Sequence, residues 1–240
     1  MKHELLEKIK APEDVKNLPE DRLPQLAEEV RDVIISTVSQ NGGHLASNLG
    51  IVELTVALHR VFNSPKDSII FDVGHQCYVH KLLTGRLDQF STIRQKDGLS
   101  GFMFPPESEH DAFVSGHSSN SVSAAFGIAC ANTLKGNSNY TISVVGDGAM
   151  TGGLAFEGLN NAGASPKSDI LVVLNDNEMS ISHNVGAMAK YLTDIRSREG
   201  YFKFKDNLEH TLLKIPVIGK SVFCVLRTIK TFFKDMFYSS

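Results

Sequence analysis

The chain of 240 residues is 42% hydrophobic and 21% charged, the balance of a soluble globular protein, and its formal net charge of −3 excludes a broadly basic surface for nucleic acid. Its cysteines, Cys77, Cys130 and Cys224, form neither a CxxC pair nor a zinc-ligand spacing, so we expect free thiols in a reducing, cytoplasmic environment. The charged N-terminus lacks the apolar core of a signal peptide, and no run of about 18 apolar residues predicts a membrane span.

The first part of the chain predicts helices around a single strand. Residues 1–23 are punctuated by prolines and are interpreted as an N-terminal arm. Apolar residues at helical spacing predict helices at 24–39 and 50–62. A short apolar run predicts a buried strand at 68–73, and a short helix at 79–85 follows it.

The second part predicts a long loop and then alternating helices and strands. Residues 95–119 are rich in Gly, Pro, Ser and His and are expected to form a functional loop. A small-residue helix at 121–134, a strand at 140–145, a helix at 152–163 and a strand at 169–174 follow. Apolar strands that alternate with helices predict an α/β fold, a parallel sheet flanked by helices on both faces.

The GDG motif at residues 146–148 ends one of these predicted strands. Ligands bind at the carboxyl ends of the strands in an open parallel sheet, and the start of the following helix favours an anion. The carboxylate of Asp147 would repel an anion unless a cation lies between them. We therefore predict that Asp147 holds a hard divalent metal, which in turn holds a diphosphate.

The next strand supports this prediction. Asn175, Asp176 and Asn177 follow it, and their oxygen atoms suit Mg²⁺. Each motif alone is explained more simply as a turn, because Gly, Asn and Asp favour turns. The two motifs on consecutive parallel strands, with one helix between them, favour the metal site.

This pair of motifs resembles the thiamine-diphosphate motif of the transketolase-like enzymes. Longer stretches resemble one family among them, the 1-deoxy-D-xylulose-5-phosphate synthases: GGHLASNLGIVELTVALH (42–59), DVGHQCYVHKLLTGR (72–86), SGHSSNSVSAAFGIA (115–129) and GDGAMTGGLAFEGLNNAG (146–163). The resemblance implies a thiamine-diphosphate-binding domain of the PP type and a homodimeric, Mg²⁺-dependent transferase. That enzyme joins a two-carbon unit from pyruvate to glyceraldehyde 3-phosphate, on the route to isoprenoid and thiamine precursors.

The resemblance also implies roles for individual residues. Mg²⁺ would be bound by Asp147, the side chain of Asn177 and the backbone carbonyl of Met179. His44 and His75 would be the catalytic residues, with His44 moving protons near the thiazolium ring. The cofactor would be contacted by His75, Gly116, His117, Ser118, Gly148, Ala149 and Asn177.

The residues themselves support only part of this assignment. The chain has nine histidines, and any one of them is more often a surface or core residue than a catalyst. His44, His75 and His117 stand out because each follows a glycine, which suits a cleft, and imidazole can move protons near neutral pH. His59 and His80 are interpreted as structural.

Two features depart from the family pattern. Asp97 stands where the family usually has glycine, and residues 103–113 lack the basic residues that the family often has there.

The family enzymes are also longer, and their second domain supplies the glutamate that activates the cofactor and the groups that bind glyceraldehyde 3-phosphate. We therefore expect this chain alone to be inactive. The alternative is a non-catalytic or split-enzyme module that binds Mg²⁺ and diphosphate and needs a partner chain.

The character of the sequence changes near residue 195. Residues 203–235 carry seven Lys or Arg against three acidic residues, with apolar residues interleaved. They could form an amphipathic helix on a membrane surface, or a segment that packs against another domain. The resemblance favours the second. We place one cofactor-binding domain at 1–195 and expect an irregular, mobile, basic segment at 196–240 that leads to a missing second domain.

Overall fold

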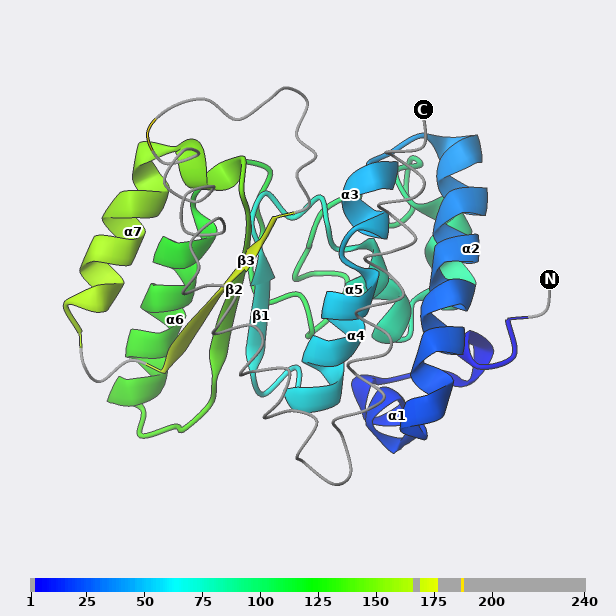
Figure 1. The fold of residues 1–240 in the computed structure, drawn as a ribbon, viewed down its shortest axis with the longest axis horizontal. Helices are drawn as coiled ribbons and strands as arrows, with labels where there is room; N and C mark the ends of the chain where they lie inside the picture. Colours follow the sequence, from blue (N-terminus) through cyan, green and yellow to red (C-terminus); the bar gives the residue numbers. More distant parts are fainter. Residues whose placement is uncertain (1–2, 166–168, 177–186, 188–240) are drawn as a thin grey trace, which may run out of the picture. The chain divides into compact units, whose positions relative to one another are not determined.

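The computed structural model describes residues 3–165, 169–176 and 187. The chain divides into two compact units, Met1–Leu18 with Gln25–Asn184, and Pro19–Pro24 with Val185–Ser240. The first unit contains a three-stranded parallel sheet in the order β1 (Ser68–Phe71), β2 (Thr141–Gly146), β3 (Ile170–Asn175). Helices lie on both sides of this sheet (Figure 1), so the predicted α/β fold is confirmed.

The strand register aligns the carboxyl ends of all three strands at one edge. Ser68 is opposite Thr141 in the first pair of strands, and Thr141 is opposite Ile170 in the second. The central strand β2 is buried along most of its length, whereas β3 leaves Leu171 and Leu174 partly exposed. The three strands predicted from apolar runs are therefore all present.

Two helices cover one face of the sheet. α6 (Ser121–Leu134) packs on the strands and against α7 (Gly153–Gly163). The two helices approach closely at Gly158, where an added Cβ would lie 2.9 Å from the Ser123 hydroxyl. Val122, Val145, Met150 and Ala155 form the hydrophobic core between the sheet and these helices.

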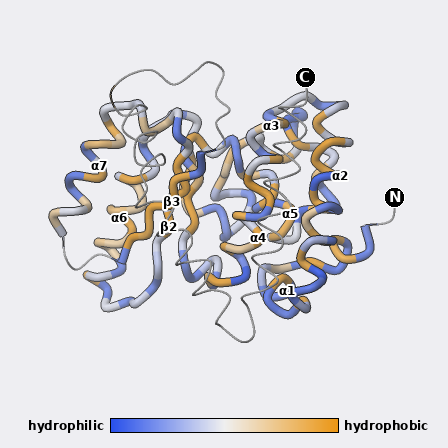
Figure 2. Tube along the Cα trace, in the orientation of Figure 1, coloured by the Kyte–Doolittle hydropathy of each residue, from blue (hydrophilic) through white to orange (hydrophobic). Residues whose placement is uncertain are grey.

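On the other side of the sheet lie α3 (Leu45–Leu49), α4 (Val52–Val61) and α5 (Tyr78–Leu83), followed by the 3₁₀ helix η3 (Leu87–Thr92), and α2 (Leu23–Asn41) lies beyond them in Figure 1. The helix predicted at 50–62 corresponds to α4. The preceding single turn, α3, was not predicted, because a five-residue helix between glycines has no detectable periodicity. Figure 2 shows apolar and polar residues alternating along α2, the pattern of a helix buried on one side.

The segment predicted as an arm has a buried apolar side. It contains η1 (Leu6–Lys8) and α1 (Pro12–Asn17), and the side chains of Leu6, Ile9 and Val15 are buried. The N–H groups of Leu5 and Leu6 both donate to the Glu29 carboxylate on α2, at 2.9 Å. A further 3₁₀ helix, η2 (Glu20–Arg22), belongs to the second unit.

Two other features complete the fold. Between η3 and α6 the chain has no helix or strand, which agrees with the long loop predicted at 95–119. No helix in the described part of the chain has the length and apolar character needed to cross a bilayer.

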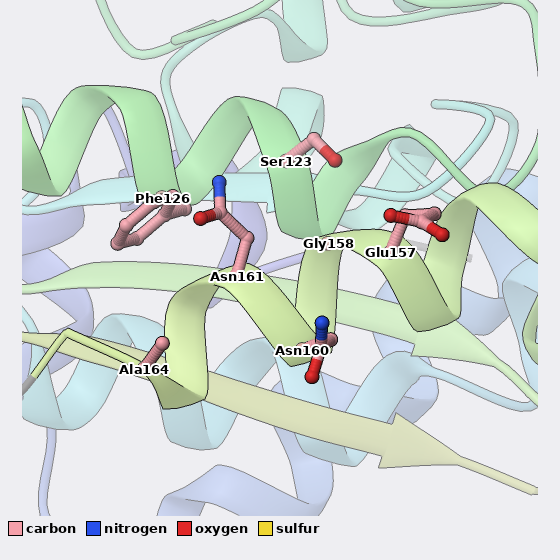
Figure 3. A pocket seen from close by; sticks show the side chains of 7 residues that line it. All are labelled: Ser123, Phe126, Glu157, Gly158, Asn160, Asn161 and Ala164. Carbon is pink, nitrogen blue, oxygen red and sulfur yellow. The ribbon is translucent and has the colours of Figure 1, made fainter.

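A cavity of about 370 Å³ lies between α6 and α7 (Figure 3). It is lined by Ser123, Phe126, Glu157, Gly158, Asn160, Asn161 and Ala164. None of these residues belongs to the site predicted from the sequence, which lies instead at the ends of the strands.

Candidate functional site

An aspartate follows each of the three strands at the edge where they end. Asp72 follows β1, Asp147 follows β2 and Asp176 follows β3. The Asp147 N–H donates to the carbonyl of Asn175 at 3.3 Å, and Gly146 is opposite Asn175 in the register. The structure therefore brings the GDG motif and the start of the NDN motif together. Asn177 and Met179, the other predicted metal ligands, lie outside the described residues.

The GDG turn approaches the adjoining strand end through residues without side chains. An added Cβ at Gly146 would meet no atom of the described residues within 4 Å, and Gly148 has an ordinary φ of −61° as it enters the 3₁₀ helix η4 (Ala149–Thr151). Close approach, rather than a left-handed backbone, is therefore what these glycines permit. The Nδ2 atom of Asn175 is buried and has no hydrogen-bond partner among the described residues. A polar ligand with oxygen atoms fits this edge.

No group of three or more His, Cys, Asp or Glu side chains in the described ranges is arranged to hold a metal. The predicted ligand set contains a single carboxylate, with an amide oxygen and a backbone carbonyl. Hard oxygen donors of this kind, completed by water and diphosphate oxygens, are the usual environment of Mg²⁺. The chemistry of the donor set therefore fits the predicted metal.

The loop that carries Gly116, His117 and Ser118 is tied to the same edge. The buried Asp72 carboxylate accepts the N–H of Ser119 at 2.7 Å and of Ser121 at 3.0 Å. The Ser119 hydroxyl donates to the Ala149 carbonyl at 2.7 Å, and Ser119 itself has a left-handed φ of 73°. Such strained non-glycine residues persist where the surrounding contacts hold them. The predicted residues at 116–118 and 148–149 therefore belong to one connected cluster.

The two predicted catalytic histidines meet each other. His44 precedes α3 and His75 follows β1, and their ring centroids are 5.1 Å apart with the planes at 71°. The Nδ1 atom of each ring is buried without a hydrogen-bond partner among the described residues. Burial lowers the pKa of both; the Arg94 charge lowers that of His44 further, and the His44 charge lowers that of His75.

Three residues beside the pair were not predicted. Phe102 lies 6.1 Å from His44 between ring centroids. The Tyr78 hydroxyl is buried, which raises the Tyr78 pKa, and an added Cβ at Gly43 would lie 2.8 Å from it. Arg94 has a left-handed φ of 64°, and its N–H donates to the Leu99 carbonyl at 2.7 Å. Only tertiary contacts place these residues at the site, so sequence patterns could not identify them.

A buried cluster of charged side chains lies under the loop. Arg86 donates two hydrogen bonds to Asp111, both at 2.8 Å, and Lys81 lies 2.5 Å from the Glu107 carboxylate. His80 lies 3.2 Å from Asp111 through Nε2. Burial acts to raise the pKa of Asp111, but hydrogen bonds from His80 and Arg86 outweigh it and hold that pKa well below its usual range.

This cluster anchors the loop that the sequence predicts at 95–119. Glu107 accepts the Ser100 N–H at 2.5 Å, and Asp111 accepts the Phe104 N–H at 2.8 Å. Asp97 adopts a left-handed φ of 60°, a conformation that aspartate tolerates better than most residues. The acidic residues of the loop are therefore used to hold it in place.

Cys77 is fully buried beside this cluster, and burial raises its pKa to about 12. It is therefore a protonated, unreactive thiol near neutral pH. Among the described residues, Cys77 forms no disulfide.

Buried histidines predict a loss of stability in mild acid. His59 Nε2 lies 3.0 Å from His80 Nδ1, and burial lowers the pKa of both histidines. The unfolded chain takes up these protons at about pH 6.5, before the folded chain does, so the free energy of unfolding is expected to fall as the pH drops below that value. His44, His75 and His110 act with the same sign.

Urea unfolding between pH 7.5 and 5 measures this effect. Replacing His59 by glutamine is expected to reduce the slope of the free energy of unfolding against pH. Replacing the buried, non-titrating Thr55 by valine is the control: it removes the hydrogen bond to the Ile51 carbonyl and should leave the slope unchanged. A stability that rises toward pH 5 would contradict the prediction.

The chain is similar to known proteins along almost its whole length. Residues 6–240 match the family model described as 1-deoxy-D-xylulose-5-phosphate synthase. The 1-deoxy-D-xylulose-5-phosphate synthase of Caldanaerobacter subterraneus subsp. tengcongensis is 56% identical over 97% of this chain and 37% of its own length. That of Alkaliphilus oremlandii is 56% identical over 98% of the chain and 38% of its own length. The chain thus spans little more than a third of these relatives.

Solved structures show the same fold. A transketolase structure from Pichia stipitis superposes with a TM-score of 0.63 at 17% identity. The match covers 73% of this chain and 30% of the transketolase chain. The transketolase from Leishmania mexicana matches 73% of this chain and 31% of its own, with a TM-score of 0.58 at 19% identity. Together with the match along almost the whole sequence, this shows that the chain belongs to the 1-deoxy-D-xylulose-5-phosphate synthase family.

Proposed function

We propose that this chain is the part of a 1-deoxy-D-xylulose-5-phosphate synthase that binds thiamine diphosphate through Mg²⁺. One observation carries the proposal: Asp147 and Asn175 are neighbours at adjoining strand ends, beside the loop that contains Gly116, His117 and Ser118. The site of a metal-bound diphosphate requires this convergence of oxygen ligands, open backbone and a following helix.

Each predicted residue has a place in this proposal. Asp147, Asn177 and Met179 would hold the metal, and Gly148 and Ala149 would offer backbone groups to the diphosphate. When bound, thiamine diphosphate supplies the carbanion chemistry that lets pyruvate lose carbon dioxide. The chain's own contribution is to bind and orient the cofactor and to provide proton donors and acceptors beside it.

The histidine pair suits proton transfer. Because burial lowers the pKa of His44 and His75, both are neutral near pH 7 and can accept a proton. The buried Nδ1 atoms provide positions at which a ligand can donate or accept a hydrogen bond. We assign His44 to proton transfer and His75 to the phosphate end of the cofactor.

The complete reaction is proposed for the longer family enzyme. The relatives are longer than this chain, so we propose that the glutamate that activates the cofactor and the groups that bind glyceraldehyde 3-phosphate lie in the part that this chain does not cover. The complete enzyme would act as a cytoplasmic homodimer that supplies a precursor for isoprenoids and thiamine. This chain alone is expected to form no product from pyruvate and glyceraldehyde 3-phosphate.

Calorimetric titration of thiamine diphosphate tests the cofactor site. With Mg²⁺ present, the chain is expected to release or absorb heat on binding, and Asp147→Ala is expected to weaken binding at least tenfold, because hard carboxylate ligands dominate Mg²⁺ affinity. Asp169→Ala is the matched control: Asp169 is exposed just before β3, at the end of the strand away from the site, and its loss should leave binding unchanged. No heat with the unsubstituted chain, or equal loss in both variants, would contradict a cofactor site formed by this chain.

A further inference from the structure

Asn48 connects the two segments that carry the histidine pair. Its side chain in α3 is fully buried, at 0% exposure. Its Nδ2 donates to the carbonyl oxygen of His44 at 2.7 Å and to that of His75, 27 residues away, at 2.8 Å. Its Oδ1 accepts the N–H of Tyr78 at 3.0 Å. Both amide protons and the amide oxygen are therefore used to hold backbone groups of two separate segments.

The rings of His44 and His75 are not held by comparable hydrogen bonds. The Nδ1 atoms of His44 and His75 have no hydrogen-bond partner among the described residues, and the rings meet only through an edge contact at 5.1 Å. The separation of the rings is therefore set by their backbones. Both backbones are attached to the amide of Asn48.

The charges that face each ring make this separation chemically important. The Arg94 charge acts on His44 and the Asp72 charge acts on His75, while the Tyr78 hydroxyl lies close to Gly43, the residue before His44. Two imidazolium rings in contact repel, so a proton on one ring opposes protonation of the other. A change in the separation of the rings would therefore change the repulsion between their protonated forms.

We propose that Asn48 is a positioning residue that fixes the spacing of His44 and His75, so that the two imidazoles take up protons as a coupled pair. The proposal rests on the proposed function only for the proton-transfer role of the pair. The spacing and the coupling are properties of this chain without any ligand.

Histidine NMR titration of the 240-residue chain tests the proposal, with the His44 and His75 signals assigned through His44→Gln and His75→Gln. Asn48→Ala removes all three hydrogen bonds, and the titration midpoints of both rings are expected to move by about half a pH unit or more. Asn48→Ser keeps one hydroxyl donor and should give a smaller shift in the same direction; it also serves if the alanine variant does not fold. Thr55→Val is the matched control, because it removes a buried hydrogen bond to the Ile51 carbonyl that involves neither histidine segment.

Unchanged midpoints in folded Asn48→Ala, or an equal shift in Thr55→Val, would overturn the proposal. A graded shift confined to the two Asn48 variants would support it over a merely structural role, since general loss of stability does not select two histidines. Failure of the proposed function would appear separately, as absence of cofactor binding by the unsubstituted chain. The ligand-free titration is independent of that result.

Discussion

Asp111→Ala is expected to lower the free energy of unfolding by about 3–5 kcal/mol, the cost of leaving buried charges without their partner. Asp111 is 2% exposed, and its carboxylate receives both Arg86 hydrogen bonds and the Phe104 N–H. Its loss would leave the buried guanidinium of Arg86 with only the longer contact to Glu107 at 3.4 Å, and would release the Phe104 N–H from the cluster. Equilibrium unfolding in urea, with the slope against denaturant compared between variants, measures the effect.

Asp88 provides the matched control for Asp111. It pairs with Lys10 at 3.5 Å across the surface, with side chains that are 81% and 58% exposed. Asp88→Ala should therefore change the free energy of unfolding by no more than about 1 kcal/mol. Similar losses in the two variants would show that the buried cluster contributes no more than a surface ion pair.

Asp72→Ala is expected to cost about 2–6 kcal/mol of stability and to abolish most cofactor binding. The cost arises because the Ser119 and Ser121 N–H groups would lose their acceptor in the protein interior, at roughly 1–3 kcal/mol for each unsatisfied group. The loss of binding follows because these hydrogen bonds fix the loop of Gly116, His117 and Ser118. Urea unfolding and calorimetry on the same samples measure the two effects.

A substitution of Asp67 separates the loss of stability from the loss of cofactor binding, because Asp67 also accepts two backbone N–H groups but lies at the opposite end of β1. It is 4% exposed and accepts the N–H groups of Asn63 at 2.7 Å and Tyr140 at 2.9 Å. Asp67→Ala should therefore cost a similar amount of stability while a folded sample keeps its affinity for thiamine diphosphate. Equal loss of affinity in the two variants would contradict a specific role for Asp72.

The parts of the fold that have strong local patterns were predictable from sequence. The apolar strands, and helices such as α6, which the prediction places at the same residues, 121–134, depend on periodicity within one segment. The approach of Asp147 to Asn175 was predictable because neighbouring parallel strands end at one edge. Asn177, Met179 and the basic segment at 196–240 lie outside the described residues and stay predictions.

The contacts that were missed join residues far apart in sequence. Asp72 follows a strand just as Asp147 does, and this shared position was a usable signal. Asn48 and the pairing of Arg86 with Asp111 had no such signal, because each residue is unremarkable in its own segment. His80 was interpreted as structural, and nothing in its sequence neighbourhood indicated that it would face Asp111.

The hydrogen bonds to Asp72 have a consequence for local dynamics. The amide protons of Ser119 and Ser121 are held by a buried carboxylate, so they can exchange with solvent deuterium only when the loop detaches from the strand end. The hydrogen–deuterium exchange rates of these two amides therefore report how often the loop opens. Ligands that close over the loop would slow both rates together, whereas fraying of α6 would affect Ser121 alone.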